Sequence, residues 1–244
     1  MKIAFDEFHK DKKYFSIDDD DQNGYEQLGD FLKGKGIECI QSTNPLTSIP
    51  ADVDVLVIPF PKRRFDGSEV KEITAFIKER GKGLLMLSEW GGIFDNVENL
   101  NQMAINFEIK FNPDRVCDWE NRIQIPFKSK AHAFYIKGFS QHYPFTKDLK
   151  ELVCISGSSL KPANQGMIAA WAGERSWSDE DGDSSYDEGE AFGYVPIVVA
   201  NVCGDAQGRV VCCGDASLLA NAQFKESEHQ KFAHSLFQWL GKEL

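Results

Sequence analysis

The 244-residue sequence has no long apolar run, and it has fewer basic than acidic side chains. A helix that spans a bilayer needs about 20 apolar residues in succession, and no segment approaches that length. The opening residues, MKIAFDEFHK, acquire charge at once, unlike the apolar stretch of a signal peptide. The formal net charge of −11 repels phosphate backbones and anionic headgroups. We therefore expect neither membrane insertion nor a nucleic-acid partner.

The sequence also lacks paired cysteine motifs and nucleotide-binding motifs. Its six cysteines are scattered, and none forms a CxxC pair. Four of them, Cys39, Cys154, Cys203 and Cys212, lie in apolar runs, which is typical of reduced core residues and predicts a cytoplasmic protein. The segment GGIFDN lacks the Lys-Ser/Thr of a phosphate-binding P-loop, and no GxGxxG motif follows an expected strand.

What is present is an alternation of strand and helix patterns. Hydrophobic residues make up 42% of the chain and charged residues 27%, as in a globular protein. Short apolar runs predict strands within 2–8, 37–40, 52–60 and 83–92, and stripes at helical spacing predict helices over 25–36 and 66–80. This order predicts an α/β fold of three layers, in which helices cover both faces of a mostly parallel sheet.

The second half is less regular. Residues 112–161 are expected to hold an antiparallel insertion, and an acidic loop is expected around 174–192. The strand pattern returns at 167–171, 194–202 and 209–213, and an amphipathic helix over 226–240 closes the chain. With no internal repeat and no clean linker, residues 1–244 are interpreted as a single domain.

Ligands of such folds gather beyond the carboxyl ends of the parallel strands. The residues expected there follow the first, third, fourth and last parallel strands: Asp6 and His9, then Phe60 and Pro61, then 89–92, then 214–217.

The order of motifs along the chain resembles the GIFT-domain family. The resemblance is carried by a strand that ends in Glu89 with Gly91 and Gly92, an Asn-rich helix over 99–106, and the stretch IKFNPDRV. The closing segments RVVCCGDASLLANAQF and HSLFQWL are similar to the last strand, turn and helix of that family. The family includes the amino-terminal domain of an intraflagellar-transport subunit and bacterial relatives linked to gliding motility.

The resemblance implies the flavodoxin-like architecture of the class I glutamine-amidotransferase-like superfamily. Active amidotransferases need a cysteine at the turn after a central strand and a His-x-Glu pair after the last strand. In this chain the first turn is Ser88-Glu89-Trp90-Gly91-Gly92 and the last is Asp215-Ala216-Ser217. Without a thiol or an imidazole at these positions, we expect a non-catalytic domain that binds a protein or a small polar ligand such as a sugar.

The expected ligand-binding residues lie on these turns and after the first strand: Asp6, His9, Glu89, Trp90, Gly91, Gly92, Asp215 and Ser217. An alternative is a hydrolase that acts on a sugar or amide bond through Glu89, Asp215 and His9. A third interpretation gives Glu89 a structural role, in which it accepts hydrogen bonds from the glycine turn.

Two acidic runs resemble calcium-binding loops. The first carries oxygens at positions 1, 3, 5, 9 and 12 of an EF-hand pattern, from Asp179, Asp181, Asp183, Asp187 and Glu190. It has Ser184 where that pattern has glycine, and no amphipathic helix flanks it. The second run, with Asp19, Asp21 and Asp30, overlaps the helix expected from residue 25. Both also fit solvated or helix-capping loops.

Aromatic residues surround the first acidic run. Trp171, Trp177 and Tyr186 lie near Glu174 and Arg175 in the sequence. Such a group suits either a platform for a sugar or peptide, or packing against a long loop.

Overall fold

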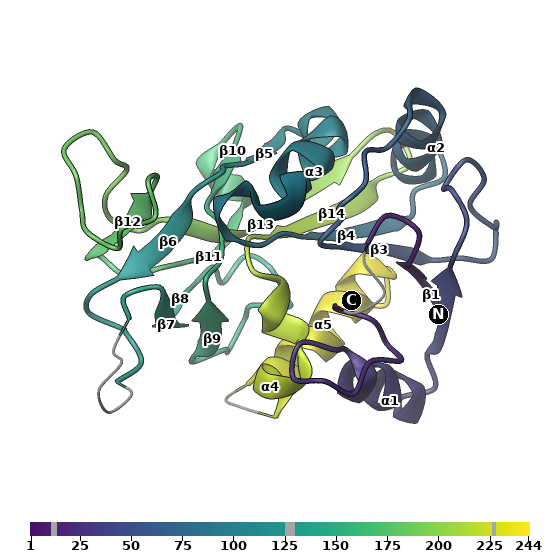
Figure 1. The fold of residues 1–244 in the computed structure, drawn as a ribbon. Helices are drawn as coiled ribbons and strands as arrows, with labels where there is room; N and C mark the ends of the chain where they lie inside the picture. The colour runs from purple at the N-terminus through teal and green to yellow at the C-terminus, as the bar shows by residue number, and fades with distance from the viewer. Residues whose placement is uncertain (11–13, 125–129, 226–227) are drawn as a thin grey trace.

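The computed structural model describes residues 1–10, 14–124, 130–225 and 228–244 (Figure 1). Its centre is an eight-stranded sheet in the order β2-β1-β3-β4-β14-β13-β11-β8. The first five of these strands run parallel: β2 (Glu38–Ser42), β1 (Lys2–Asp6), β3 (Val55–Pro59), β4 (Gly83–Leu87) and β14 (Gly208–Cys213). The expected mixed α/β fold with a large, mostly parallel sheet is confirmed.

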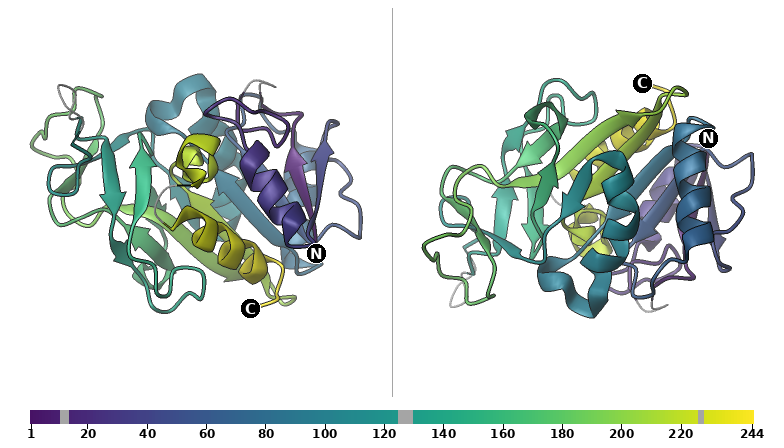
Figure 2. Two further views of the ribbon diagram at one scale, coloured as in Figure 1. Left: turned by 90° about the horizontal axis from the view of Figure 1, so that it is seen from below. Right: turned by 90° about the horizontal axis from the view of Figure 1, so that it is seen from above.

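The parallel strands are apolar because both faces of the sheet are covered. All five residues of β3 and of β4 are buried. Helices α1 (Glu26–Gly34), α4 (Asn221–Phe224) and α5 (His229–Leu240) pack on one face, and α2 (Gly67–Lys78) and α3 (Asn96–Ala104) on the other (Figure 2). Each face has its own buried apolar cluster.

Helix α2 begins where its sequence predicts. The Asp66 carboxylate accepts hydrogen bonds from the backbone N–H groups of Ser68 and Glu69, at 2.7 and 3.0 Å. In return the Glu69 carboxylate accepts from the Asp66 N–H at 2.9 Å. This capping box satisfies donors that the first turn of a helix leaves without partners.

The other end of the sheet is antiparallel. Strand β13 (Pro196–Cys203) pairs with β14 across a short turn, and a turn of that length permits only antiparallel pairing. Strands β11 (Ile168–Trp171) and β8 (Gly138–Phe139) extend the sheet further.

Three two-stranded antiparallel sheets complete a lobe beside this end (Figure 1). They pair β5 (Ile109–Phe111) with β10 (Leu160–Pro162), β6 (Arg115–Asp118) with β12 (Ser176–Asp179), and β7 (Ala133–Ile136) with β9 (Leu152–Ile155). Strand β12 is a correction, because the sequence predicted only a loop over 174–192. The described part of the chain has no helix both long and apolar enough to cross a membrane.

Short 3-10 helices occupy several turns: η1 (Trp90–Asp95), η2 (Ile105–Phe107), η3 (Gln165–Met167) and η4 (Ala216–Leu219). Helices η1 and η4 follow β4 and β14, so both lie at the carboxyl edge of the parallel strands.

Candidate functional site

Glu89 and Asp215 follow two neighbouring parallel strands. Strands β4 and β14 pair in a register that sets Leu87 opposite Cys213, and each carboxylic residue comes two positions later. The Ala216 N–H donates to the Ser88 carbonyl at 2.7 Å, which ties the two turns together. The structure therefore brings this expected pair to one point on the sheet edge.

Asp215 is fully buried and its oxygens are engaged. Its carboxylate accepts hydrogen bonds from the backbone N–H groups of Ile155, at 2.6 Å, and Ser217, at 2.7 Å. Burial raises the pKa of Asp215, although these hydrogen bonds oppose the rise. The Ser217 hydroxyl is also buried, and it lies near Asp215 without meeting hydrogen-bond geometry to any described residue.

Glu89 is only partly exposed, and its surroundings disfavour a negative charge. Burial and then the charge of Asp215 raise the pKa of Glu89 well above its usual value, while the nearby Ser217 N–H opposes the rise. The Glu89 backbone N–H donates to Asn96 Oδ1 at 3.1 Å. A carboxyl group that resists ionisation can donate a hydrogen bond as well as accept one.

The turn after Glu89 has an unusual backbone. Gly91 and Gly92 have φ angles of 61° and 63°, and Phe94 and Asp95 are also left-handed, at 54° and 57°. Glycine adopts such angles without the clash that a Cβ causes, whereas the other two residues are strained. The Gly91 N–H donates to the Asp114 carbonyl at 2.7 Å, so the antiparallel lobe holds the turn in place.

Two side chains of the turn contact cations. The Arg115 guanidinium lies 5.0 Å from the ring centroid of Trp90. The Lys62 ammonium lies 3.8 Å from the ring centroid of Phe94, a side chain that is 59% exposed. Both contacts are within the range of a cation–π attraction. Neither Phe94 nor Arg115 was predicted as a site residue from the sequence.

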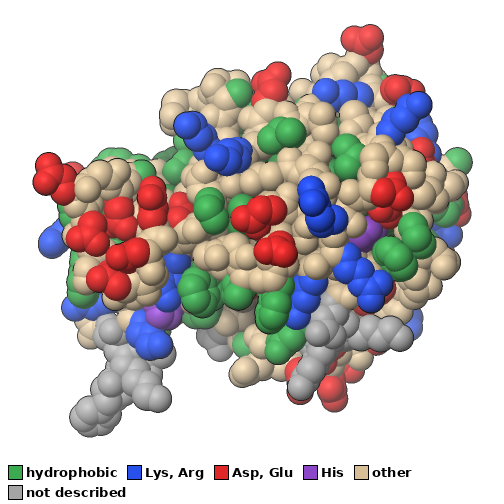
Figure 3. Space-filling view, turned by 45° about the horizontal axis from the view of Figure 1, so that its top comes forward, with side chains coloured by type: hydrophobic (Ala, Val, Ile, Leu, Met, Phe, Trp, Pro, Cys, Tyr) green, Lys and Arg blue, Asp and Glu red, His purple; other side chains and the backbone are tan. Residues whose placement is uncertain are grey.

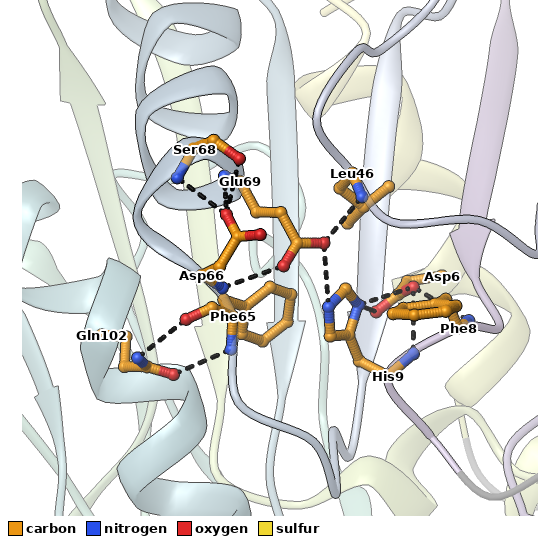
Figure 4. A network of polar contacts seen from close by, with 9 residues as sticks. All are labelled: Asp6, Phe8, His9, Leu46, Phe65, Asp66, Ser68, Glu69 and Gln102. Carbon is orange, nitrogen blue, oxygen red and sulfur yellow. Dashed lines mark hydrogen bonds and ion pairs between the residues drawn. The ribbon is translucent and has the colours of Figure 1, made fainter.

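Asp6 and His9 belong to a separate network (Figure 4). His9 Nδ1 lies 2.9 Å from Asp6 Oδ2, and His9 Nε2 lies 3.0 Å from Glu69 Oε1, although this second contact falls outside hydrogen-bond geometry. The imidazole stacks on Phe65, with ring centroids 3.9 Å apart. All three polar side chains are at most 4% exposed. We call Asp6, His9 and Glu69 the His9 network.

The His9 network stands apart from the Glu89–Asp215 pair, because β3 lies between β1 and β4. Burial lowers the pKa of His9, but Asp6 and then Glu69 outweigh this effect and raise it above the usual value. Both ring nitrogens of His9 face a carboxylate. Glu69 was not predicted from the sequence as a partner of His9. Its position three residues after Asp66 indicates only a capping box.

The cysteines near the pair are not activated. Burial, and then the charge of Asp215, raises the pKa of the Cys154 and Cys213 thiols. The His229 imidazole, also fully buried, accepts a hydrogen bond from the Val153 N–H at 2.8 Å and lies 2.7 Å from the Leu218 carbonyl. A nucleophilic cysteine needs a lowered pKa, usually from a nearby cation or imidazole.

The acidic loop brings its carboxylates together in two groups. Ligand oxygens within 4.8 Å of one another come from Asp179, Asp181 and Glu190 in the first group and from Asp181, Asp183 and Asp187 in the second. Figure 3 shows acidic side chains gathered at the end of this face where the loop lies. Calcium binding here stays a prediction.

Other contacts of this loop differ from the EF-hand pattern. Asp179 is the last residue of β12 and not the first of a loop between helices. Its carboxylate is paired with Arg115, whose Nη2 lies 2.8 Å from Oδ2. In the second acidic run, Asp30 lies inside α1, and Asn221 donates to the carbonyls of Asp19 and Asp21. These contacts tie the second run to the start of α4. Asp19, Asp20 and Asp21 also have ligand oxygens within 4.8 Å of one another, so calcium binding there stays a prediction too.

The expected aromatic platform is only partly exposed. Trp177 is fully buried, and its indole N–H donates to the Ser185 carbonyl at 2.9 Å, so packing explains this residue. Tyr186 and Phe192 are 47% and 54% exposed, with ring centroids 5.0 Å apart. Trp119, 44% exposed, stacks on Trp177. The sequence did not indicate Trp119 or Phe192.

Comparison with known proteins places the chain in a family. A protein-family model described as "Domain of unknown function (DUF4350)" matches residues 17–237, which is most of the chain. The chain belongs to this family. No curated protein matches the sequence significantly.

Among solved structures, the mmIFT52 N-terminal domain has a TM-score of 0.70 and 16% sequence identity, over 98% of this chain and 97% of that one. This similarity shows a shared fold. PurLQS from Thermotoga maritima has a TM-score of 0.46 at 12% identity, over 98% of both chains. The exo-beta-1,4-mannosidase Op5Man5 from Opitutaceae bacterium strain TAV5 has 0.45 at 12% identity, over 96% of this chain and 35% of that one. TM-scores below 0.5 do not establish a shared fold.

Proposed function

We propose that this chain is a non-catalytic binding domain whose binding surface lies at the carboxyl ends of β4 and β14. The surface is formed by Glu89, Trp90, Gly91 and Gly92, together with the Asp215–Ser217 turn. Its ligand is a protein, or a small polar molecule such as a sugar. Asp6 and His9 support the end of β1 from within, since their buried contacts leave no surface for a ligand.

The observation that carries this proposal is the environment of Glu89. Acyl transfer at this turn needs a thiol with a base beside it, and the neighbouring turn supplies a second carboxyl group, Asp215, with a raised pKa. The pKa of each of the six cysteines is raised, with burial as the first cause. Thiols of this kind stay protonated at neutral pH and are poor nucleophiles.

We further propose that the fold is the flavodoxin-like architecture of class I glutamine-amidotransferase-like proteins, in the GIFT-like branch. The order β2-β1-β3-β4-β14 corresponds to the flavodoxin order 2-1-3-4-5, which supports this assignment. The fold shared with the mmIFT52 N-terminal domain supports it too. Kinship of fold alone is an analogy for function.

We also propose a cytoplasmic location. All six cysteines are free and buried or half-buried, which fits a reducing compartment. The net charge of −11 favours a partner with basic groups.

The alternative, a hydrolase, is favoured by one specific observation. Glu89 has the raised pKa that a general acid needs, and Asp215 lies beside it. His9 does not support this alternative, because Asp6 and Glu69 occupy both of its ring nitrogens.

Two arms of one experiment separate these functions. The tagged protein is first used to capture a partner, whose affinity is then measured with purified components. Phe94→Asn removes an exposed ring next to the Glu89 turn and is expected to weaken binding at least about tenfold. Val202→Asn is the matched control, because Val202 is 44% exposed at the opposite edge, beside the start of β14.

The second arm measures hydrolysis of sugar and amide substrates by the wild type and by Glu89→Gln. The binding function predicts no turnover in either protein. Turnover by the wild type that Glu89→Gln abolishes would establish the hydrolase instead. If the partner binds the wild type, Phe94→Asn and Val202→Asn with equal affinity, the Glu89 turn is not part of the binding surface.

A further inference from the structure

A polar hollow of about 690 Å³ is lined by the β5–β10 strand pair and by the segment that follows the acidic loop. Its volume is in the range that small-molecule sites occupy. Its lining residues come from β5, β10 and their neighbours, from Ser178 and Glu180, and from 191–196. The polar side chains that line it are Lys110, Asn112, Asp114, Ser159, Lys161, Gln165, Ser178 and Glu180.

Two lysines lie opposite each other in this strand pair. The register pairs Lys161 of β10 directly with Lys110 of β5. Both side chains are exposed, whereas Ile109, Phe111 and Leu160 beside them are buried, so the two lysines share the outer face of the strand pair. Directly opposite residues have Cβ atoms about 5 Å apart, and like charges at that spacing destabilise a sheet.

No carboxylate among the described residues forms an ion pair with either lysine. Asp114 lines the hollow but is only 3% exposed. Its oxygens accept hydrogen bonds from the Ser159 N–H at 2.7 Å and from the hydroxyls of Ser159 and Ser178. Glu180 also lines the hollow. The hollow is therefore lined by two lysines from directly opposite strand positions, in a protein whose net charge is −11.

We propose that this hollow binds a small molecule through a phosphate or carboxylate group held between Lys110 and Lys161. An anion with at least two oxygens accepts from both ammonium groups and removes their repulsion. The amides of Asn112 and Gln165 supply neutral donors nearby, and Asn112 Nδ2 already donates to Ser159 Oγ at 2.9 Å. This site is independent of the proposed function at Glu89, because its residues belong to other elements.

Thermal unfolding tests the site with two probes, inorganic phosphate and malonate, at constant ionic strength. A bound anion stabilises the folded state by mass action, so either probe is expected to raise the Tm of the wild type saturably, by about 3–6 °C at tenfold excess over Kd. The probe with the larger effect distinguishes a phosphate from a carboxylate ligand. NMR amide shifts are expected at 109–114 and 159–165.

Lys161→Glu separates anion binding from general surface charge. It replaces a repulsive cross-strand pair by an attractive one, so its Tm without anion is expected to exceed that of the wild type, while its response to anion is lost. Lys147→Glu makes the same charge change at an exposed position outside the hollow and is expected to keep the response. An equal anion response in the wild type and Lys161→Glu, or its loss in Lys147→Glu, would overturn the proposal, as would amide shifts confined to other regions.

Discussion

Two groups of carboxylates lie at carboxyl ends of parallel strands, and their surroundings differ. In the His9 network an imidazole lies between Asp6 and Glu69, and all three side chains are buried. In the Glu89–Asp215 pair no cation among the described residues forms an ion pair with either acid, and Glu89 is partly exposed. The same edge of the sheet thus supports a closed network at β1, in which an imidazole lies between two acids, and an open pair of acids at β4 and β14. The second is the one that we propose as part of a binding surface.

The largest effect is expected when the closed network is broken. His9→Gln leaves Asp6 and Glu69 buried without their shared cation, and breaking a buried ion pair costs about 3–5 kcal/mol. Urea unfolding measures the loss. His142→Gln, at an exposed position, is the control and should change stability by less than about 0.5 kcal/mol. A loss below about 1 kcal/mol for His9→Gln would mean that the network is not charge-compensated.

The pH dependence of stability sharpens the same comparison. The folded-state pKa of His9 is raised above its usual value near 6.5, so the protonated form is favoured in the folded protein. Its contribution is complete below about pH 6 and is lost as the pH rises through the folded-state pKa. The difference in unfolding free energy between the wild type and His9→Gln should therefore shrink from pH 6 upward. A difference independent of pH would show that His9 does not titrate.

At the turn after Glu89, the left-handed backbone of Gly91 is expected to make the largest contribution to the change in stability on mutation. Gly91→Ala places a Cβ at a φ of 61°, where nothing lies within 4 Å, so backbone strain is the only cost, about 1–2 kcal/mol. Gly67→Ala is the matched control, because Gly67 also has open space but lies in α2 without a positive φ. That control should stabilise by about 0.5–1 kcal/mol. Equal effects in the two variants would disprove the strain at Gly91.

Removing the charge of Glu89 is expected to stabilise the protein slightly. Its folded-state pKa is raised, so wild-type stability falls as the pH rises from about 4.3 through that pKa. Glu89→Gln removes this loss and should add up to about 1 kcal/mol at pH 7, with no gain near pH 4. Chemical unfolding at both pH values measures it. Destabilisation at pH 7 would instead indicate a structural role for the carboxylate.

The smallest effect concerns calcium. If the loop over 179–190 binds it, 1 mM calcium should raise the Tm by a degree or two relative to a chelator, because a ligand of the folded state stabilises it. Asp183→Asn should remove the shift, and Asp205→Asn, in the exposed β13–β14 turn, should keep it. A Tm unchanged by calcium in the wild type would leave the loop a solvated surface feature.

The parallel half of the fold could be predicted because its signals are local. Each parallel strand is a short apolar run. The start of α2 is marked by Asp66 and Glu69, which are three positions apart as in a capping box. The antiparallel lobe could not be predicted in detail. Strands such as β6 and β12 have four residues each, and their register joins Arg115 to Asp179 across a long sequence separation. No local pattern reports such pairing.

The candidate site shows the same division. That Glu89 lies beside Asp215 follows from the rule for carboxyl ends of neighbouring parallel strands. The environment of His9 did not follow, because Glu69 reaches it from a helix, and the sequence gives Glu69 only a capping role. Trp177 is buried in strand β12. This strand was not predicted, because the acidic residues that follow it are typical of a loop.

Hydrogen–deuterium exchange of the complex with its captured partner tests the binding surface most directly. A binding domain that uses the Glu89 turn should show added protection at 88–98 and 214–218 when the partner is bound, with no change at the β13–β14 turn. Protection confined to other segments, or a covalent adduct on a cysteine after exposure to an acyl-transfer substrate, would contradict the account.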